Sequence, residues 1–174
     1  RGMEMLMINW VGDGNGYSGD INLKPEKAHT LSATFDWHAP DRSWEVKATP
    51  FYTHVTDYID AVRCPTSLGG ACSVANLSGG NKFVYLQLAN QSARLYGLDL
   101  SGHMPLASTG FGEFGLKGLL NYTNGENRDT GDDLYNIMPL NAKLALVQRV
   151  GSWTNTAEAQ WVGSKTNVSQ VRNE

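Results

Sequence analysis

The sequence predicts an all-β fold: a long antiparallel meander of about six strands that forms part of the wall of an outer-membrane β-barrel. Three observations predict it. Apolar and polar residues alternate through long stretches, and the connections between these stretches are short and long in turn. The composition is rich in residues of hairpins and aromatic girdles, with 19 Gly, 5 Trp, 7 Tyr and 5 Phe in 174 residues.

The first two predicted strands cover residues 28–39 and 43–61. In the first, apolar residues such as Phe35 and Trp37 alternate with polar residues. This period of two sends successive side chains to opposite faces of a strand. Because proline has no amide hydrogen to give to a neighbouring strand, Pro50 predicts a bulge in the second strand.

The later strands follow the same pattern. Trp153 and Trp161 share one face of the last strand, roughly 26 Å apart along it. After allowance for barrel tilt, this approaches the separation of two aromatic girdles. The third to sixth strands are expected at residues 82–104, 111–122, 138–150 and from 153 onward.

The connections between the strands alternate in length. Short turns are expected at residues 40–42, 105–110 and 151–152, whereas the other links are long and polar. Outer-membrane barrels have short periplasmic turns and long external loops. We therefore expect the turns in the periplasm, and residues 64–72 and 124–136 outside. A soluble β-sandwich, the alternative, would favour shorter strands and less regular connections.

Cys64 and Cys72 are the two cysteines of the chain, and they lie in a stretch rich in Gly, Ser and Pro. Two thiols in one flexible loop can meet, so we expect a disulfide. It would contribute about 2.5 kcal/mol by restricting the unfolded chain, and it implies an oxidising compartment. Two free thiols are the alternative, while a metal centre would need further ligands.

Composition and motifs argue against several functions. The net charge is -3 and no basic run occurs, so we expect no nucleic acid partner. No apolar run reaches the length of a transmembrane helix. Because no acid–base or nucleophile constellation is present, we expect no enzyme. Asp129, Asp132 and Asp133 are interpreted as a solvated loop tip, with a cation site as the alternative.

Met3, Met5 and Met7 occupy alternate positions near the start of the chain. On a strand, alternate residues point to one face. Three thioethers on one face are soft ligands that suit Cu(I), which makes these residues candidate metal ligands. The alternative is three apolar side chains at the rim or on the lipid face of a barrel.

Leu-Lys-Pro-Glu at residues 23–26 is the first of four notable stretches, and the other three are residues 50–59, 93–99 and 137–143. Together these stretches resemble TonB-dependent outer-membrane receptors, in the order in which that family has them, and the first resembles the family's NxxLKPE motif. Residues 7–17 and 57–64 look most like the copper-receptor branch.

The resemblance implies a barrel of about 22 strands with an N-terminal plug inside it. We expect residues 1–174 to be a partial barrel domain that lacks the plug, the early strands and the last strand. The resemblance also implies a bacterial outer-membrane protein in contact with lipid, coupled to the TonB complex through the plug. Its cargo would be a scarce metal or a metal chelate, with copper expected and siderophore iron or haem as alternatives.

No resident cofactor is expected in this segment, and copper would be cargo. A non-transporting β-module or adhesin that binds a partner or glycan is the alternative from another class. For the transporter, the alternation predicts which side chains face the lumen. They are Thr30, Thr34, Asp36, Lys117, Asn121, Asn141, Lys143, Glu158 and Gln160.

Overall fold

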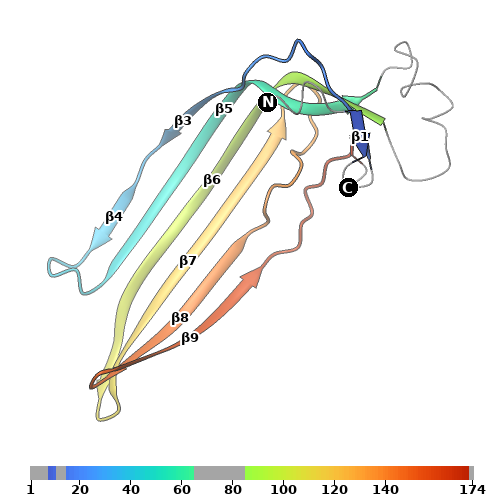
Figure 1. Cartoon of the computed structure of the whole chain (residues 1–174). Coiled ribbons are helices and arrows are strands. Elements are labelled where there is room, and N and C mark those ends of the chain that lie inside the picture. The colour runs from blue at the N-terminus through green and yellow to red at the C-terminus, as the bar shows by residue number, and fades with distance from the viewer. Residues whose placement is uncertain (1–7, 11–14, 65–84, 173–174) are drawn as a thin grey trace.

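The computed structural model describes residues 8–10, 15–64 and 85–172. All the regular structure in these residues is β, in one open sheet (Figure 1). The described residues contain no helix that is long and apolar enough to cross a membrane. The strands are β1 (Ile8–Trp10), β2 (Gly16–Ser18), β3 (Lys27–Ser32), β4 (Phe35–His38), β5 (Glu45–Arg63), β6 (Tyr85–Thr109), β7 (Gly112–Asn127), β8 (Asn141–Val150) and β9 (Trp153–Val162).

The predicted antiparallel meander is confirmed. β3 and β4 both pair with β5, and β5 to β9 then pair in chain order, each antiparallel to the next. β1 and β2, which the sequence did not predict, pair with each other. β2 also runs parallel to β6. It occupies the stretch of the β6 edge that lies beyond the end of β7, whose own pairing with β6 stops at Ala93.

Pro50 does not produce a bulge in β5, so that prediction is wrong. Pro50 pairs in register with Leu98 of β6 and sits inside a continuous strand. The missing amide hydrogen of Pro50 affects the strand on the other side of β5, where β3 and β4 pair. The amide of Ala33 donates to the carbonyl of Pro50, but Pro50 cannot donate in return. This is the place where the first predicted strand divides into β3 and β4.

The register shift in β5 lies further along, between Val55 and Tyr58. Asp57 adopts a φ of 56° there, and the extra residue defines a bulge. A second shift lies between Pro105 and Ala107 of β6. The turn predicted at 105–110 is therefore shorter, because β6 continues through most of it.

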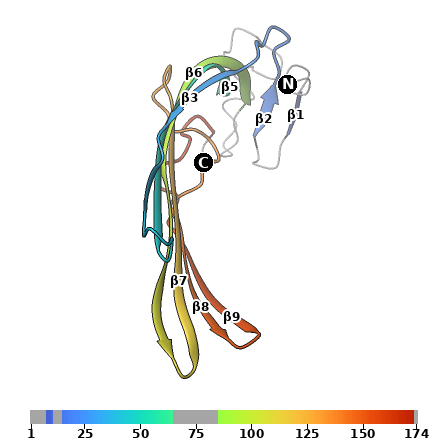
Figure 2. The ribbon, with the colours of Figure 1, turned by 90° about the vertical axis from the view of Figure 1, so that its left-hand side faces the viewer.

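The two ends of the sheet differ. At the end that we call the turn end, short turns join β4 to β5, β6 to β7, and β8 to β9 (Figure 1). At the opposite end, which we call the loop end, β5 ends at Arg63, β6 begins at Tyr85, and residues 128–140 connect β7 to β8. The predicted alternation of short and long connections is therefore present. At the loop end β5 and β6 curl over toward the side where β1, β2 and the C-terminus lie (Figure 2).

One face of the sheet, which we call the apolar face, carries apolar side chains across six strands. Leu144 and Trp161 on it are 53% and 57% exposed, and a groove of about 720 Å³ runs between Val46, Leu120 and Leu144. Register places Trp37, Val46, Gly102, Gly118, Leu144 and Ala159 side by side in one row of this face.

Aromatic side chains lie toward both ends of the apolar face. Tyr52 and Tyr96 are register partners toward the loop end. Trp37 and Trp153 lie toward the turn end. Trp153 and Trp161 share this face through their partners on β8, which confirms the predicted pair. The result is an apolar band with aromatic residues at its two borders.

Buried apolar residues gather at the loop end, where segments outside the long strands cover the sheet. Leu134, from the connection between β7 and β8, packs on Val55 and Ala93. The other cluster lies around the ends of β5 and β6 and consists of Tyr17, Leu23, Ala61, Leu86 and Leu88.

Candidate functional site

The face opposite the apolar face is polar, and we call it the polar face. A hollow of about 420 Å³ on it is lined by Glu45, His103, Lys117, Lys143 and Glu158 among others. Alternation alone produces this separation, because each strand sends every second side chain to each face. One register row of the polar face consists of Asp36, Lys47, Ser101, Leu119, Lys143 and Gln160.

Several charges on the polar face pair with one another. The Glu45 carboxylate lies 2.6 Å from Arg42 and 2.6 Å from Lys47. Lys143 lies 3.4 Å from Glu158 on the next strand. Charges of both signs at such density are tolerated where water reaches them, and they are costly where hydrocarbon does. The polar face is thus suited to line an aqueous path.

Each residue that the alternation assigned to one face lies on the polar face. Thr30 and Thr34 lie on the polar face. Their hydroxyls contact those of Thr53 and Thr49 on this face, at 2.8 Å and 3.0 Å. The other predicted residues share its register rows, and they include Asp36, Lys117, Asn121, Asn141, Lys143, Glu158 and Gln160. Side-chain hydrogen bonds link neighbours in these rows, as between Asn121 and Asp99 at 2.7 Å.

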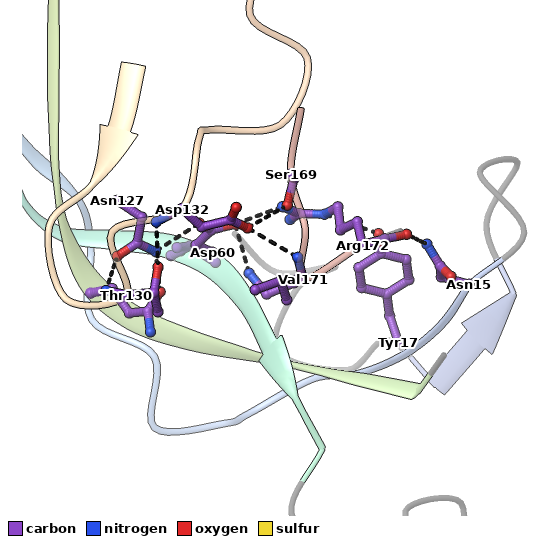
Figure 3. Close-up of polar contacts among 12 residues, drawn as sticks. Asn15, Tyr17, Asp60, Asn127, Thr130, Asp132, Ser169, Val171 and Arg172 are labelled. Carbon is purple, nitrogen blue, oxygen red and sulfur yellow. Dashed lines mark hydrogen bonds and ion pairs between the residues drawn. The ribbon is translucent and has the colours of Figure 1, made fainter. Parts of the chain in front are cut away.

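At the loop end the polar face leads into a buried group of charged and amide side chains, which we call the loop-end cluster (Figure 3). At its centre Arg172 Nη1 lies 2.8 Å from Asp60 Oδ1, and the two side chains are 10% and 8% exposed. Arg172 Nε also donates to the Tyr17 hydroxyl at 3.2 Å. Asn127 Nδ2 donates to the second Asp60 oxygen at 2.9 Å, so both oxygens of this buried carboxylate are satisfied.

The pKa of Arg172 reflects these contacts. Burial acts to lower it, but the negative charge of Asp60 and the hydrogen bonds to Asp60 and Tyr17 outweigh burial and raise the pKa of the guanidinium. Arg172 also lies over the Tyr135 ring, 4.8 Å from its centroid. The ion pair is therefore charged and held from several strands at once.

Asp132 joins the C-terminal segment to the connection between β7 and β8. Its carboxylate accepts hydrogen bonds from the amides of Gln170 and Val171, at 2.9 Å and 3.0 Å, and from the Ser169 hydroxyl at 3.0 Å. Partial burial acts to raise the pKa of Asp132, but these donors outweigh it and hold the pKa below the usual 3.8.

The interpretation of the three aspartates as a solvated loop tip is wrong for Asp132, which is half-buried and anchors residues 169–171. Asp129 is exposed in a turn, where it accepts a hydrogen bond from the amide of Ser92 at 2.7 Å. The alternative, a cation site, gains no support, since the described residues contain no group of three or more His, Cys, Asp or Glu placed to hold a metal. The partners of Asp132 lie about forty residues away in sequence, so no local pattern pointed to them.

The remaining predicted site residues lie at or beyond the limits of the described structure. Met3, Met5 and Met7 fall outside the described residues, so their role as copper ligands stays a prediction. Cys64 follows the end of β5, is 4% exposed and is not a free cysteine. Cys72 also falls outside the described residues, so the pairing of the two cysteines stays a prediction.

The comparisons with known proteins agree with this geometry. The family model described as TonB dependent receptor-like, β-barrel, matches residues 5–173. The chain belongs to this family. The family expected from the four sequence motifs is therefore confirmed, and the chain belongs with receptor barrels and not with enzymes.

A solved structure named "Copper transporter OprC" is similar to this TonB-dependent receptor chain, with a TM-score of 0.66 and 21% sequence identity. The match covers 87% of this chain and 21% of that one. The chain therefore spans about a fifth of the length of the structure it matches. At this identity the similarity establishes the fold. Among the curated proteins, none matches the chain.

Proposed function

We propose that the chain is part of the barrel domain of a TonB-dependent active transporter in the bacterial outer membrane, and that the transporter imports copper. The separation of an apolar from a polar face across the six paired strands β4 to β9 carries the first part of this proposal. The apolar face, bordered by aromatic residues, would contact lipid. The polar face would line the lumen, where a plug domain outside this chain would couple to the TonB complex.

Copper as cargo is supported by two observations. The similar structure carries the name of a copper transporter, and the sequence places three methionines at Met3, Met5 and Met7, a soft ligand set that favours Cu(I). Siderophore iron and haem are the alternatives within the same family. The adhesin alternative is disfavoured by the exposed apolar face, because a soluble module would cover Leu144 and Trp161.

Copper uptake by cells that carry the intact receptor tests the proposal. We expect copper-dependent growth or accumulation to fall when the receptor is deleted, and uptake of siderophore iron and haem to stay unchanged. The reverse pattern would assign the receptor to iron. Replacing Met3, Met5 and Met7 by Leu should weaken Cu(I) binding. Matched controls are Met104→Leu and Met138→Leu, which change the same residue type elsewhere and should leave Cu(I) binding unaltered.

A further inference from the structure

Two histidines face each other at the loop end of the apolar face. His29 of β3 is the direct register partner of His54 of β5. The neighbouring pair is Thr30 and Thr53, whose hydroxyls lie 2.8 Å apart on the polar face. Because side chains alternate between faces, the two imidazoles share the apolar face. They stand one row beyond the pair formed by Leu31 and Tyr52.

The spacing of this pair follows from the hydrogen-bond pattern. The amide of Ala33 donates to the carbonyl of Pro50, so every second pair from there is a hydrogen-bonded pair. The next hydrogen-bonded pair is Leu31 with Tyr52, and the one after it is His29 with His54. The Cα atoms of such a pair are about 5.5 Å apart. Imidazole nitrogens bind metals at about 2.0–2.1 Å. Two rings projecting from this separation can reach a common ion.

The ring nitrogens of this pair are available. His38 contacts the Ala39 carbonyl at 2.8 Å and His103 contacts the Arg42 carbonyl at 3.3 Å. His29 and His54 make no hydrogen bond or ion pair to other residues in the part of the chain that the structure describes. His29 is exposed and His54 is half-buried. Both can therefore offer a lone pair to an ion from solvent.

The charge that lies opposite His54 on β6 is already paired, whereas Lys27 shares the face of His29 two residues away on β3. Arg94 is the register partner of His54 on the far side from His29. Its guanidinium is engaged by Glu126, with Nε donating at 3.1 Å and Nη2 at 2.5 Å to the same carboxylate oxygen. The arginine charge is thus offset by a carboxylate.

We propose that His29 and His54 form a binding site for a divalent transition-metal ion, with Cu(II) preferred, on the outer surface of the barrel wall. Imidazole suits Cu(II), Ni(II) and Zn(II), and among these the order of affinity favours Cu(II). Two protein ligands leave the remaining positions to water. The site lies on the opposite face from the polar face, so it is separate from the path of the proposed cargo.

Electron paramagnetic resonance of the intact, metal-stripped receptor titrated with Cu(II) tests this site. We expect a bound Cu(II) signal with hyperfine structure from two nitrogens. His29→Gln and His54→Gln should each lose that signature and weaken binding by about 100-fold, since a second tethered ligand raises apparent affinity by at least that factor. His38→Gln is the matched control, and it should retain both the two-nitrogen signature and the affinity.

Two outcomes would overturn the proposal. One is an unchanged Cu(II) signal in both His29→Gln and His54→Gln. The other is an equal loss in His38→Gln. Circular dichroism of each variant checks that the barrel is intact. Replacing Met3, Met5 and Met7 by Leu should leave this Cu(II) signal in place, which separates failure of the surface site from failure of the proposed cargo site.

Discussion

The middle of the sheet and its loop end differ in how their side chains are covered. In the middle, β5 to β9 pair edge to edge, and Leu144 on the apolar face is left 53% exposed. At the loop end, the segments around Asp132 and Arg172 fold over the strands and bury an ion pair. The middle depends on its surroundings for cover, whereas the loop end supplies its own. Whether an added charge is tolerated should therefore depend on where it lies in the sheet, and not on how many charges the protein already carries.

Breaking the buried ion pair gives the largest expected effect. Arg172→Met leaves Asp60 charged and buried, which costs about 3–5 kcal/mol. Hydrogen exchange of the intact receptor should show the protection of the Gln170 and Val171 amides falling by more than about 100-fold. The double variant Asp60→Asn with Arg172→Met should lose less than the single one. Equal protection in wild type and Arg172→Met would show that the pair does not hold this segment.

A charge added to the middle of the sheet tests the two faces directly. Leu144 lies on the apolar face and Leu119 on the polar face, in adjacent register rows. Leu144→Arg should destabilise the receptor in lipid vesicles by about 2–4 kcal/mol, the cost of arginine against lipid. Leu119→Arg, at similar depth, should cost about 1 kcal/mol or less, the cost expected of an exposed site. Denaturant titration measures both, and equal costs would contradict the assignment of the faces.

Acid should loosen the loop end through Asp132. Its pKa is lower in the folded protein than the usual 3.8, because the donors from residues 169–171 outweigh burial. A lowered carboxyl pKa contributes stability that is present above 3.8 and is lost as pH falls through the folded value. Digestion by an acid protease should therefore release the C-terminal segment as pH falls below 3.8.

In the variant Asp132→Asn, the C-terminal segment should be held less tightly already at neutral pH. The free energy that holds it should fall by about 1.5 kcal/mol, the lower part of the range for hydrogen bonds to a charged acceptor. Asp133→Asn is its matched control. Burial and the charges of Asp132 and Glu126 raise the pKa of Asp133, so removing its charge should not weaken the segment. A cleavage profile that Asp132→Asn leaves unaltered would argue against this anchor.

The smallest effect is expected on the polar face. Lys143 and Glu158 lie 3.4 Å apart with side chains 39% and 50% exposed. Such pairs contribute about 0.2–1 kcal/mol because water screens them. Lys143→Ala should therefore shift the denaturation midpoint of the receptor only slightly. A loss as large as that of Arg172→Met would mean that the polar face is shielded from water.

The sequence predicted the middle of the sheet better than the loop end, for a physical reason. The period of two is a local property, so the placement of Lys117, Asn141 and Glu158 on one face could be derived from neighbouring residues alone. The contacts of Asp60, Asp132 and Arg172 join residues far apart in the chain, and no short pattern encodes them. The prediction of a bulge at Pro50 failed for a related reason. Pro50 cannot donate a hydrogen bond, and which of its two neighbouring strands lacks that bond depends on how the strands pair.

The bulge between Val55 and Tyr58 reverses which side chains of β5 face each side of the sheet. Before it, odd-numbered residues of β5 face the polar side; after it, even-numbered residues do, as Asp60 shows by pairing with Ala89. One inserted residue therefore sends the Asp60 carboxylate toward Arg172 instead of outward. If β5 paired with β6 without this extra residue, Ile59 would lie opposite Ala89 and Asp60 would turn to the apolar face. Arg172 would then be left without its anion.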